Sequence, residues 1–241
     1  MKRLMIVAAC VIPIAAAQTA NGVLGISLNP KSGSLGVPLQ IVLLLTALTL
    51  LPAIIMSVTP FLRIVVVLHF LRQALGTQTS PSNQVLVGLS LFLTILVMQP
   101  VLNEAYTKAW EPMEKGEKTP AEAWDAASPP IKNFLLKYAR EKDIHLFLEI
   151  SHAPQPAKPA DVGMAVLVPS YVLSELKTAF QIGAVLFLPF LMIDLIVASV
   201  TLSVGMVQLP PVMISAPFKI LLFVLVDGWN LVVGSLVKTF Y

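Results

Sequence analysis

The hydrophobic and polar positions divide the chain into long apolar runs and shorter polar stretches. Four apolar segments cover residues 39–61, 85–101, 179–204 and 212–237. Each has roughly 17 to 26 residues, and about 20 apolar residues in a helix cross the hydrocarbon core of a bilayer. The pattern predicts an all-α, polytopic protein built from membrane-inserted helical hairpins.

Prolines fall inside these apolar runs, at Pro52, Pro60, Pro100, Pro189 and Pro217. Proline has no backbone N–H and removes a hydrogen bond from a helix interior. A membrane-inserted helix tolerates that loss where neighbouring protein groups satisfy the backbone. The four long apolar helices are therefore expected to be kinked.

Residues 103–177 differ from the rest of the chain because they hold nine of the sixteen basic and eleven of the thirteen acidic residues. Thr119-Pro120-Ala121-Glu122 predicts a helix start, with Thr119 as the cap and Glu122 completing a capping box. Ser128-Pro129 predicts the start of another helix. The stretch is interpreted as a small helical, water-facing insert.

The first residues have the layout of a secretory signal, with a basic Lys2-Arg3 head and an apolar run that ends at Ala17. A retained anchor and a lipoprotein cleavage box at Cys10 are the alternatives. The predicted division is a cleavable signal peptide (1–17), a polar N-terminal segment (18–38), a first apolar hairpin (39–102), the insert (103–177) and a second apolar hairpin (178–241).

Removal of the signal would leave the new N-terminus outside the cell membrane. Four crossings then place the insert outside, and place both the 76–84 loop and the 205–211 turn inside. Arg63 and Arg72 flank that inside loop, which agrees with the excess of positive charge found on cytoplasmic loops. The expected location is a cell membrane.

Composition supports the membrane assignment and narrows the function. The chain is 56% hydrophobic and 12% charged, whereas soluble domains carry about 25% charged residues. The net charge of +3 comes without a basic block, so no nucleic-acid partner is expected. No metal-binding, nucleophile or phosphate-loop motif is present in the sequence. We expect no enzyme activity, no metal and no cofactor.

Four charges stand in apolar surroundings: Arg63, Asp194, Lys219 and Asp227. Such charges are costly in a bilayer unless they are paired, hydrated or turned into protein. They serve either helix and subunit packing or a proton or ion path, and packing is the favoured interpretation. A hairpin that turns near Gly205 places Asp194 opposite Lys219, which predicts a contact. Asp227 is left to contact another subunit or to accept bonds from Trp229 and Asn230.

The turn between the last two apolar segments combines a flexible glycine with two prolines that interrupt the helix. Unpaired backbone at membrane depth requires surrounding protein or a water-filled cavity, and methionine can form a deformable apolar seal. An ordinary loop is the alternative. The candidate gate residues are Gly205, Met206, Val207, Gln208, Leu209, Pro210, Pro211 and Met213.

The chain resembles the FliP family of flagellar export-gate proteins, which has counterparts in injectisome type III secretion. The resemblance is carried by "LLPAIIMSVTPFLRIVVVLHFLRQALGTQTSPSNQVLVGLSLFLTILVM", "SELKTAFQIG", "FLPFLMIDLIVASV" and "LPPVMISAPFKILLFVLVDGWNLVVGSL". These stretches occur in the family's order and cover over half of the chain that follows the signal. The insert matches in position and helical character only.

The resemblance implies a homo-oligomer of about five copies that assembles with FliQ and FliR, next to other export-gate membrane proteins. Unfolded flagellar subunits would enter the channel of this assembly in the flagellar basal body. It also implies kinked hairpins, with much of the assembly on the periplasmic side, and a methionine-rich constriction at the last turn. Here only Met206 lies in the tight part of that turn, and Met213 follows the prolines.

An alternative of another class is a secondary transporter or ion channel that uses Asp194 and Asp227 as ion-binding carboxylates. Transporters usually contain internal repeats, and the two apolar pairs show none. Membrane lipid is an expected contact under either interpretation.

Overall fold

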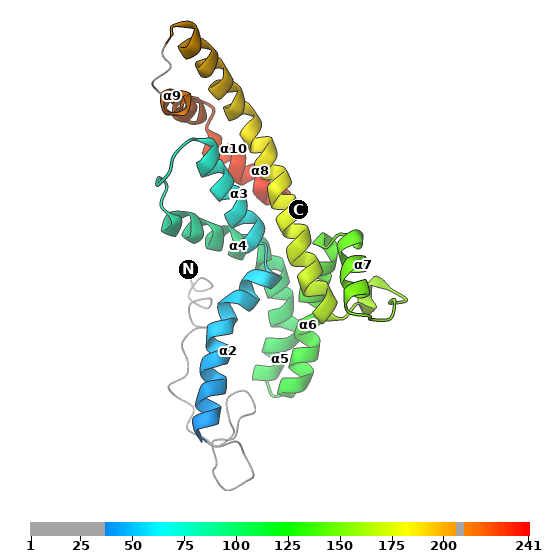
Figure 1. Ribbon diagram of the computed structural model, residues 1–241. Coiled ribbons are helices and arrows are strands. Elements are labelled where there is room, and N and C mark those ends of the chain that lie inside the picture. The colour runs from blue at the N-terminus through cyan, green and yellow to red at the C-terminus, as the bar shows by residue number, and fades with distance from the viewer. Residues whose placement is uncertain (1–36, 206–209) are drawn as a thin grey trace. The chain divides into compact units, whose positions relative to one another are not determined.

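A computed structural model describes residues 37–205 and 210–241, and every regular element in these ranges is a helix (Figure 1). The expected all-α fold is confirmed for this part of the chain. The predicted signal at 1–17, the polar segment that follows it up to residue 36, and Met206 to Leu209 lie outside the described residues. The elements are α2 (Val37–Val58), α3 (Phe61–Ala74), α4 (Asn83–Ala105), the π-helical turn η2 (Tyr106–Trp110), α5 (Glu111–Glu114), α6 (Pro120–Tyr138), α7 (Glu141–Ile150), the 3-10 turn η3 (Pro159–Asp161), α8 (Met164–Ser203), α9 (Pro211–Leu225) and α10 (Gly228–Lys238).

Three helices in the described residues are long and apolar enough to cross a membrane, and they cover Leu39–Val58, Asn83–Glu114 and Met164–Ser203. The fourth apolar segment is not one straight helix. It divides into α9 and α10, which meet at an angle of 68° and together could form a fourth, bent span. The break falls at Val226–Asp227, where Asp227 adopts a left-handed backbone with φ of 51°.

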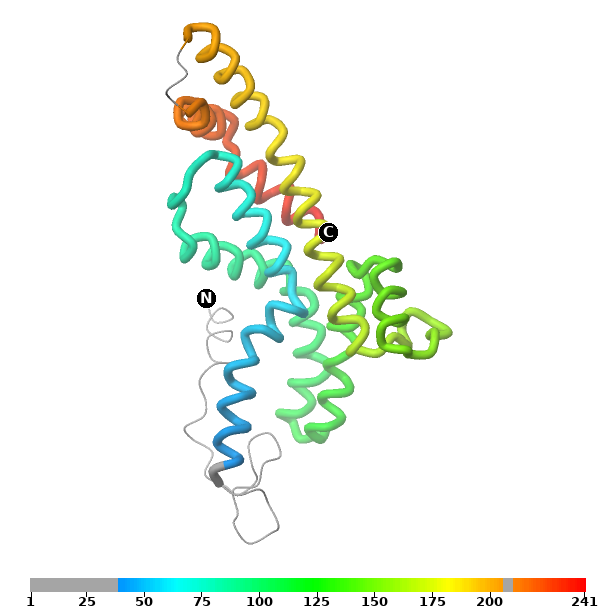
Figure 2. Tube along the Cα trace, in the orientation of Figure 1, coloured from blue at the N-terminus to red at the C-terminus, as the bar shows by residue number. Residues whose placement is uncertain are grey.

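The described chain divides into two units between Pro52 and Ala53. In the larger unit, α3 packs along α8 and against α4 (Figure 2). Ile64, Val67, Leu68 and Leu71 have no exposed surface. Their spacing of three or four residues puts them on one face of α3. This face, together with residues of α4, α8, α9 and α10, forms the first hydrophobic core.

The start of α6 matches its sequence signal. Thr119 caps the helix and forms a capping box with Glu122, as predicted. The second helix start predicted at Ser128 is wrong, because Pro129 and Pro130 lie inside the continuous α6. Pro129 cannot donate to the Asp125 carbonyl. The Ser128 hydroxyl donates to that oxygen instead, at 3.3 Å, and this bond replaces the lost backbone bond.

Helix α8 joins the insert to the last hairpin without interruption. It begins at Met164 and passes through residue 177, where the insert was expected to end. Leu167 and Tyr171, near its start, belong to a second core with Phe134 and Leu148 of the insert. Ala179 and Phe190, further along, belong to the first hydrophobic core, together with Ile64 of α3. One helix therefore contributes to both cores.

Candidate functional site

The contact predicted across the last hairpin is present. The ammonium of Lys219 in α9 donates to Oδ2 of Asp194 in α8 over 2.7 Å. Ser215 donates its hydroxyl to the other carboxylate oxygen. The Lys219 side chain is only 4% exposed, against 29% for Asp194. A buried ammonium is stable when its charge is paired, so this interaction fastens α9 to α8.

Arg63 in α3 is also buried, and its partner is Glu175 in α8. The guanidinium makes two hydrogen bonds to the carboxylate, one of them from Nε to Oε2 over 2.8 Å. The two side chains are 4% and 0% exposed. Two parallel bonds between Arg and a carboxylate fix the geometry as well as the charge. The pair thus sets how α3 lies on α8.

Sequence reasoning found the buried charge of Arg63 but missed its partner. Glu175 was counted with the charges of the water-facing insert. A signal was available, because Tyr171, Glu175 and Ala179 follow one another at four-residue spacing and all three are fully buried. A glutamate on the apolar face of a helix predicts a buried partner of opposite charge.

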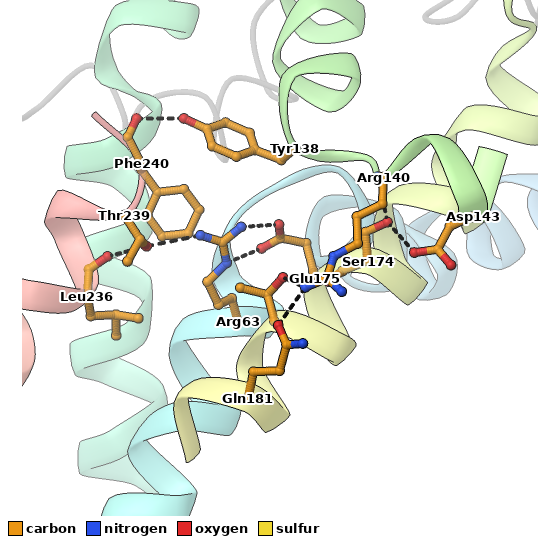
Figure 3. Close-up of polar contacts among 11 residues, drawn as sticks. Arg63, Tyr138, Arg140, Asp143, Ser174, Glu175, Gln181, Leu236, Thr239 and Phe240 are labelled. Atoms are coloured by element: carbon orange, nitrogen blue, oxygen red, sulfur yellow. Dashed lines mark hydrogen bonds and ion pairs between the residues drawn. The ribbon is translucent and has the colours of Figure 1, made fainter. Parts of the chain in front are cut away.

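The end of α10 reaches the same ion pair (Figure 3). Arg63 donates to the Thr239 hydroxyl over 3.0 Å, and its guanidinium carbon lies 4.0 Å from the centre of the Phe240 ring. Tyr138 of α6 donates its hydroxyl to the Phe240 carbonyl over 2.6 Å. Helices α3, α6 and α8 and the residues after α10 therefore meet around Arg63 and Glu175.

A second polar group on α8 connects it to the start of α7. Ser174 accepts a bond from the Arg140 amide and donates to Asp143, while Lys177 forms an ion pair with Asp143. The Arg140 side chain continues along α8 to Gln181 over 2.7 Å (Figure 3). Burial alone would raise the pKa of Asp143. The bonds from Lys177 and Ser174 and the nearby positive charges outweigh it, so the pKa lies below its ordinary value.

Asp227 is exposed, unlike the buried Arg63 and Lys219. It lies exposed at the break between α9 and α10 and accepts a hydrogen bond from the Asn230 side chain over 3.2 Å. Trp229 packs its ring against Phe223, with the ring centres 5.5 Å apart. Of the two neighbours predicted to donate to Asp227, Asn230 does so in the described structure.

The candidate gate residues form the turn between α8 and α9, and the structure describes this turn only at its two ends. Gly205 follows α8 with φ of 79°, a left-handed conformation that favours glycine. Pro210 occupies the position before α9 and Pro211 is the first residue of the helix, where a missing N–H costs nothing. Met213 is 74% exposed. Met206, Val207, Gln208 and Leu209 lie outside the described residues, so their role stays a prediction.

Comparison with known proteins gives one consistent result. The model of the FliP family matches residues 44–236. The flagellar biosynthetic protein FliP of Pectobacterium carotovorum subsp. carotovorum is 51% identical over 84% of this chain and 78% of its own length. FliP of Caulobacter vibrioides is 47% identical over 96% and 87%, and FliP of Bacillus subtilis 49% identical over 83% and 91%. The expected resemblance is confirmed: the chain belongs to the FliP family.

Proposed function

We propose that this component of flagellar protein export is a structural, pore-forming subunit of the type III export gate. Several copies would enclose the opening of a channel through which unfolded flagellar subunits pass. The proposed location is the inner membrane at the flagellar basal body, with much of the assembly on the periplasmic side. FliQ and FliR are the proposed partners, next to other export-gate membrane proteins.

The observation that carries this proposal is the distribution of charge and apolar surface on the last hairpin. Its charges Asp194 and Lys219 bond to each other inside the chain. Its outer surface is apolar: Val185, Ile196 and Val224 are each more than 60% exposed. Apolar patches of this kind mark contacts with protein or with membrane. Further copies, partner proteins and lipid would cover this surface.

The constriction of the channel is proposed at the turn from Gly205 to Pro211, with Met213 beside it. Family resemblance supports this assignment, and so does the flexibility of methionine as a seal. If Met206 closes the resting channel, Met206→Ala should increase the leakage of small solutes while export continues. Ion leakage measured in cells that express the variant, with Met213→Ala for comparison, tests this assignment. Unchanged leakage in Met206→Ala would count against it.

A transporter or ion channel that uses Asp194 and Asp227 is the weaker alternative. Both carboxylate oxygens of Asp194 already accept bonds, from Lys219 and from Ser215. Asp227 lies at the bend between α9 and α10, where it accepts a hydrogen bond from Asn230. The two carboxylates therefore do not form a shared ion site within the described chain.

Extraction of the protein after co-expression with FliQ and FliR separates the two functions. The export gate predicts a large, stable homo-oligomer that retains both small hydrophobic partners in detergent. A transporter predicts a monomer or dimer with proton-coupled uptake. The second result would overturn the proposal.

A further inference from the structure

The hairpin of α8 and α9 is interrupted in both of its arms. In α8, Pro189 has no N–H to donate to the Val185 carbonyl, so the helix lacks one hydrogen bond there. After α9, the backbone turns by 68° at Val226–Asp227. Helices kink at prolines and where their backbone hydrogen bonding is interrupted.

The two interruptions lie next to each other in space, and one side chain contacts both. The Phe223 ring lies 6.4 Å from that of Phe190, the residue after Pro189. The same ring lies against Gly228, where an added Cβ would approach it to 2.2 Å, and 5.5 Å from the Trp229 ring. Phe223 is itself 5% exposed. It therefore fills the space between the two breaks.

The parts of α8 on either side of Pro189 are held differently. Eight of the ten residues described as buried in α8 precede Pro189, including Glu175 and Gly183. Glu175 is fixed by Arg63, and Gly183 is so close to Phe70 that an added Cβ would lie 2.4 Å from its ring. Beyond Pro189 the buried residues are Phe190 and Thr201. The part of α8 before Pro189 is therefore anchored to other helices, and the part after Pro189 is largely exposed.

The part of α8 after Pro189 is nevertheless bonded to α9. Lys219 and Ser215 of α9 both bond to Asp194 of α8, five residues beyond Pro189. Both bonds lie between the two interruptions and the turn of the hairpin, because Asp194 follows Pro189 and Lys219 precedes Val226. They hold the two arms of the tip together.

We propose that the described tip of the hairpin, Phe190–Ser203 with Pro211–Leu225, moves as one rigid lever. Its hinge is formed by Pro189 and by Val226 to Gly228, and Phe223 is the pivot between them. The inference rests on the proposed export function, since the lever would widen the channel when an unfolded chain enters. The Asp194–Lys219 pair makes the arms move together, and the Arg63–Glu175 pair holds the base in place.

Distances within the assembled complex test the movement directly. One spin-label pair joins the base to the tip, with Glu149→Cys and Ser199→Cys; a second pair lies within the tip, with Ser199→Cys and Phe218→Cys. All three positions are exposed. Cys10, the single native cysteine, is changed to serine, and labelled copies are diluted with unlabelled ones. A flagellar export substrate fused to a folded domain, which cannot pass, occupies the channel.

The lever predicts that the base-to-tip distance differs between the empty and the occupied complex, while the distance within the tip stays constant. An unchanged base-to-tip distance would overturn the hinge, as would an equal change in both pairs. Occupation of the channel by the stalled substrate is detected separately, by its co-purification. Absence of a bound substrate would contradict the proposed export function and not the hinge.

Three variants test the pivot through export. Gly228→Ala should lower export severalfold because its Cβ meets the Phe223 ring. Gly234→Ala in the same helix is the matched control, since nothing lies within 4 Å of its Cβ. Pro189→Ala regains the helix bond and should lower export while the complex assembles in normal amounts. Normal export in both Gly228→Ala and Pro189→Ala would contradict the hinge.

Discussion

Single residues in this chain show how buried charges are made stable. Arg63 and Lys219 are both almost fully enclosed, and each has a carboxylate partner on α8. Sequence alone predicted the Asp194–Lys219 contact because both residues stand in one hairpin, where the register relates them. It could not relate Arg63 to Glu175, since 112 residues separate them and only tertiary packing brings them together.

Removing one partner of the Arg63–Glu175 pair should be strongly destabilising. Glu175→Gln leaves a buried guanidinium without its counter-charge, and breaking such a pair costs about 3–5 kcal/mol. The matched control is Glu111→Gln, which breaks an exposed pair with Lys115, a kind of pair that contributes little to stability. The apparent melting temperature of each variant in detergent measures the difference. Similar melting temperatures for the two variants would contradict a stabilising role for the buried pair.

Charge reversal tests the Asp194–Lys219 pair. Asp194→Lys and Lys219→Asp alone each place two like charges side by side and should reduce the amount of assembled complex. The double variant restores opposite charges and should recover part of the loss. Quantities of complex after detergent extraction are compared. If the single variants assemble as well as the double variant, the pair does not hold the hairpin together.

At the scale of helices, local signals decided where α6 begins and long-range packing decided where other elements end. The capping box at Thr119 predicted one helix start correctly. The break after α9 could not be predicted from the apolar run, because it depends on Asp227 adopting a left-handed backbone and on Phe223 packing over Gly228. Likewise, α8 continues through the polar part of the insert because its first turns pack into the insert's own core.

The attachment of α7 to α8 should depend on pH through Asp143. Its pKa is lowered in the folded chain, so the stabilisation is fully present above the unfolded pKa of about 3.9 and is lost as the pH falls through the lower folded value. Asp143→Asn should therefore melt at a lower temperature than the wild type at pH 7, and this difference should shrink below about pH 4. The exposed Glu149→Gln is the control. A difference that persists unchanged at low pH would contradict the role of the carboxylate charge.

At the scale of the whole molecule, the apolar helices of the described chain bury the paired charges Arg63 and Lys219 and expose many apolar side chains. Hydropathy predicted the apolar helices, and the described residues contain three or four that could span a membrane. Neither the sequence nor a single chain specifies what covers their exposed surfaces, since lipid and protein helices are equally apolar. The proposed answer, that other subunits cover much of that surface, is a statement about the assembly.

Particle imaging of the complex purified with FliQ and FliR tests this central claim most directly. The account predicts several copies of this chain, about five by family resemblance, arranged around a central channel. The turn from Gly205 to Pro211 should face the channel axis, and the paired charges should lie inside each copy. A monomer or dimer without a central channel, or a ring whose 205–211 turns point away from the axis, would contradict it.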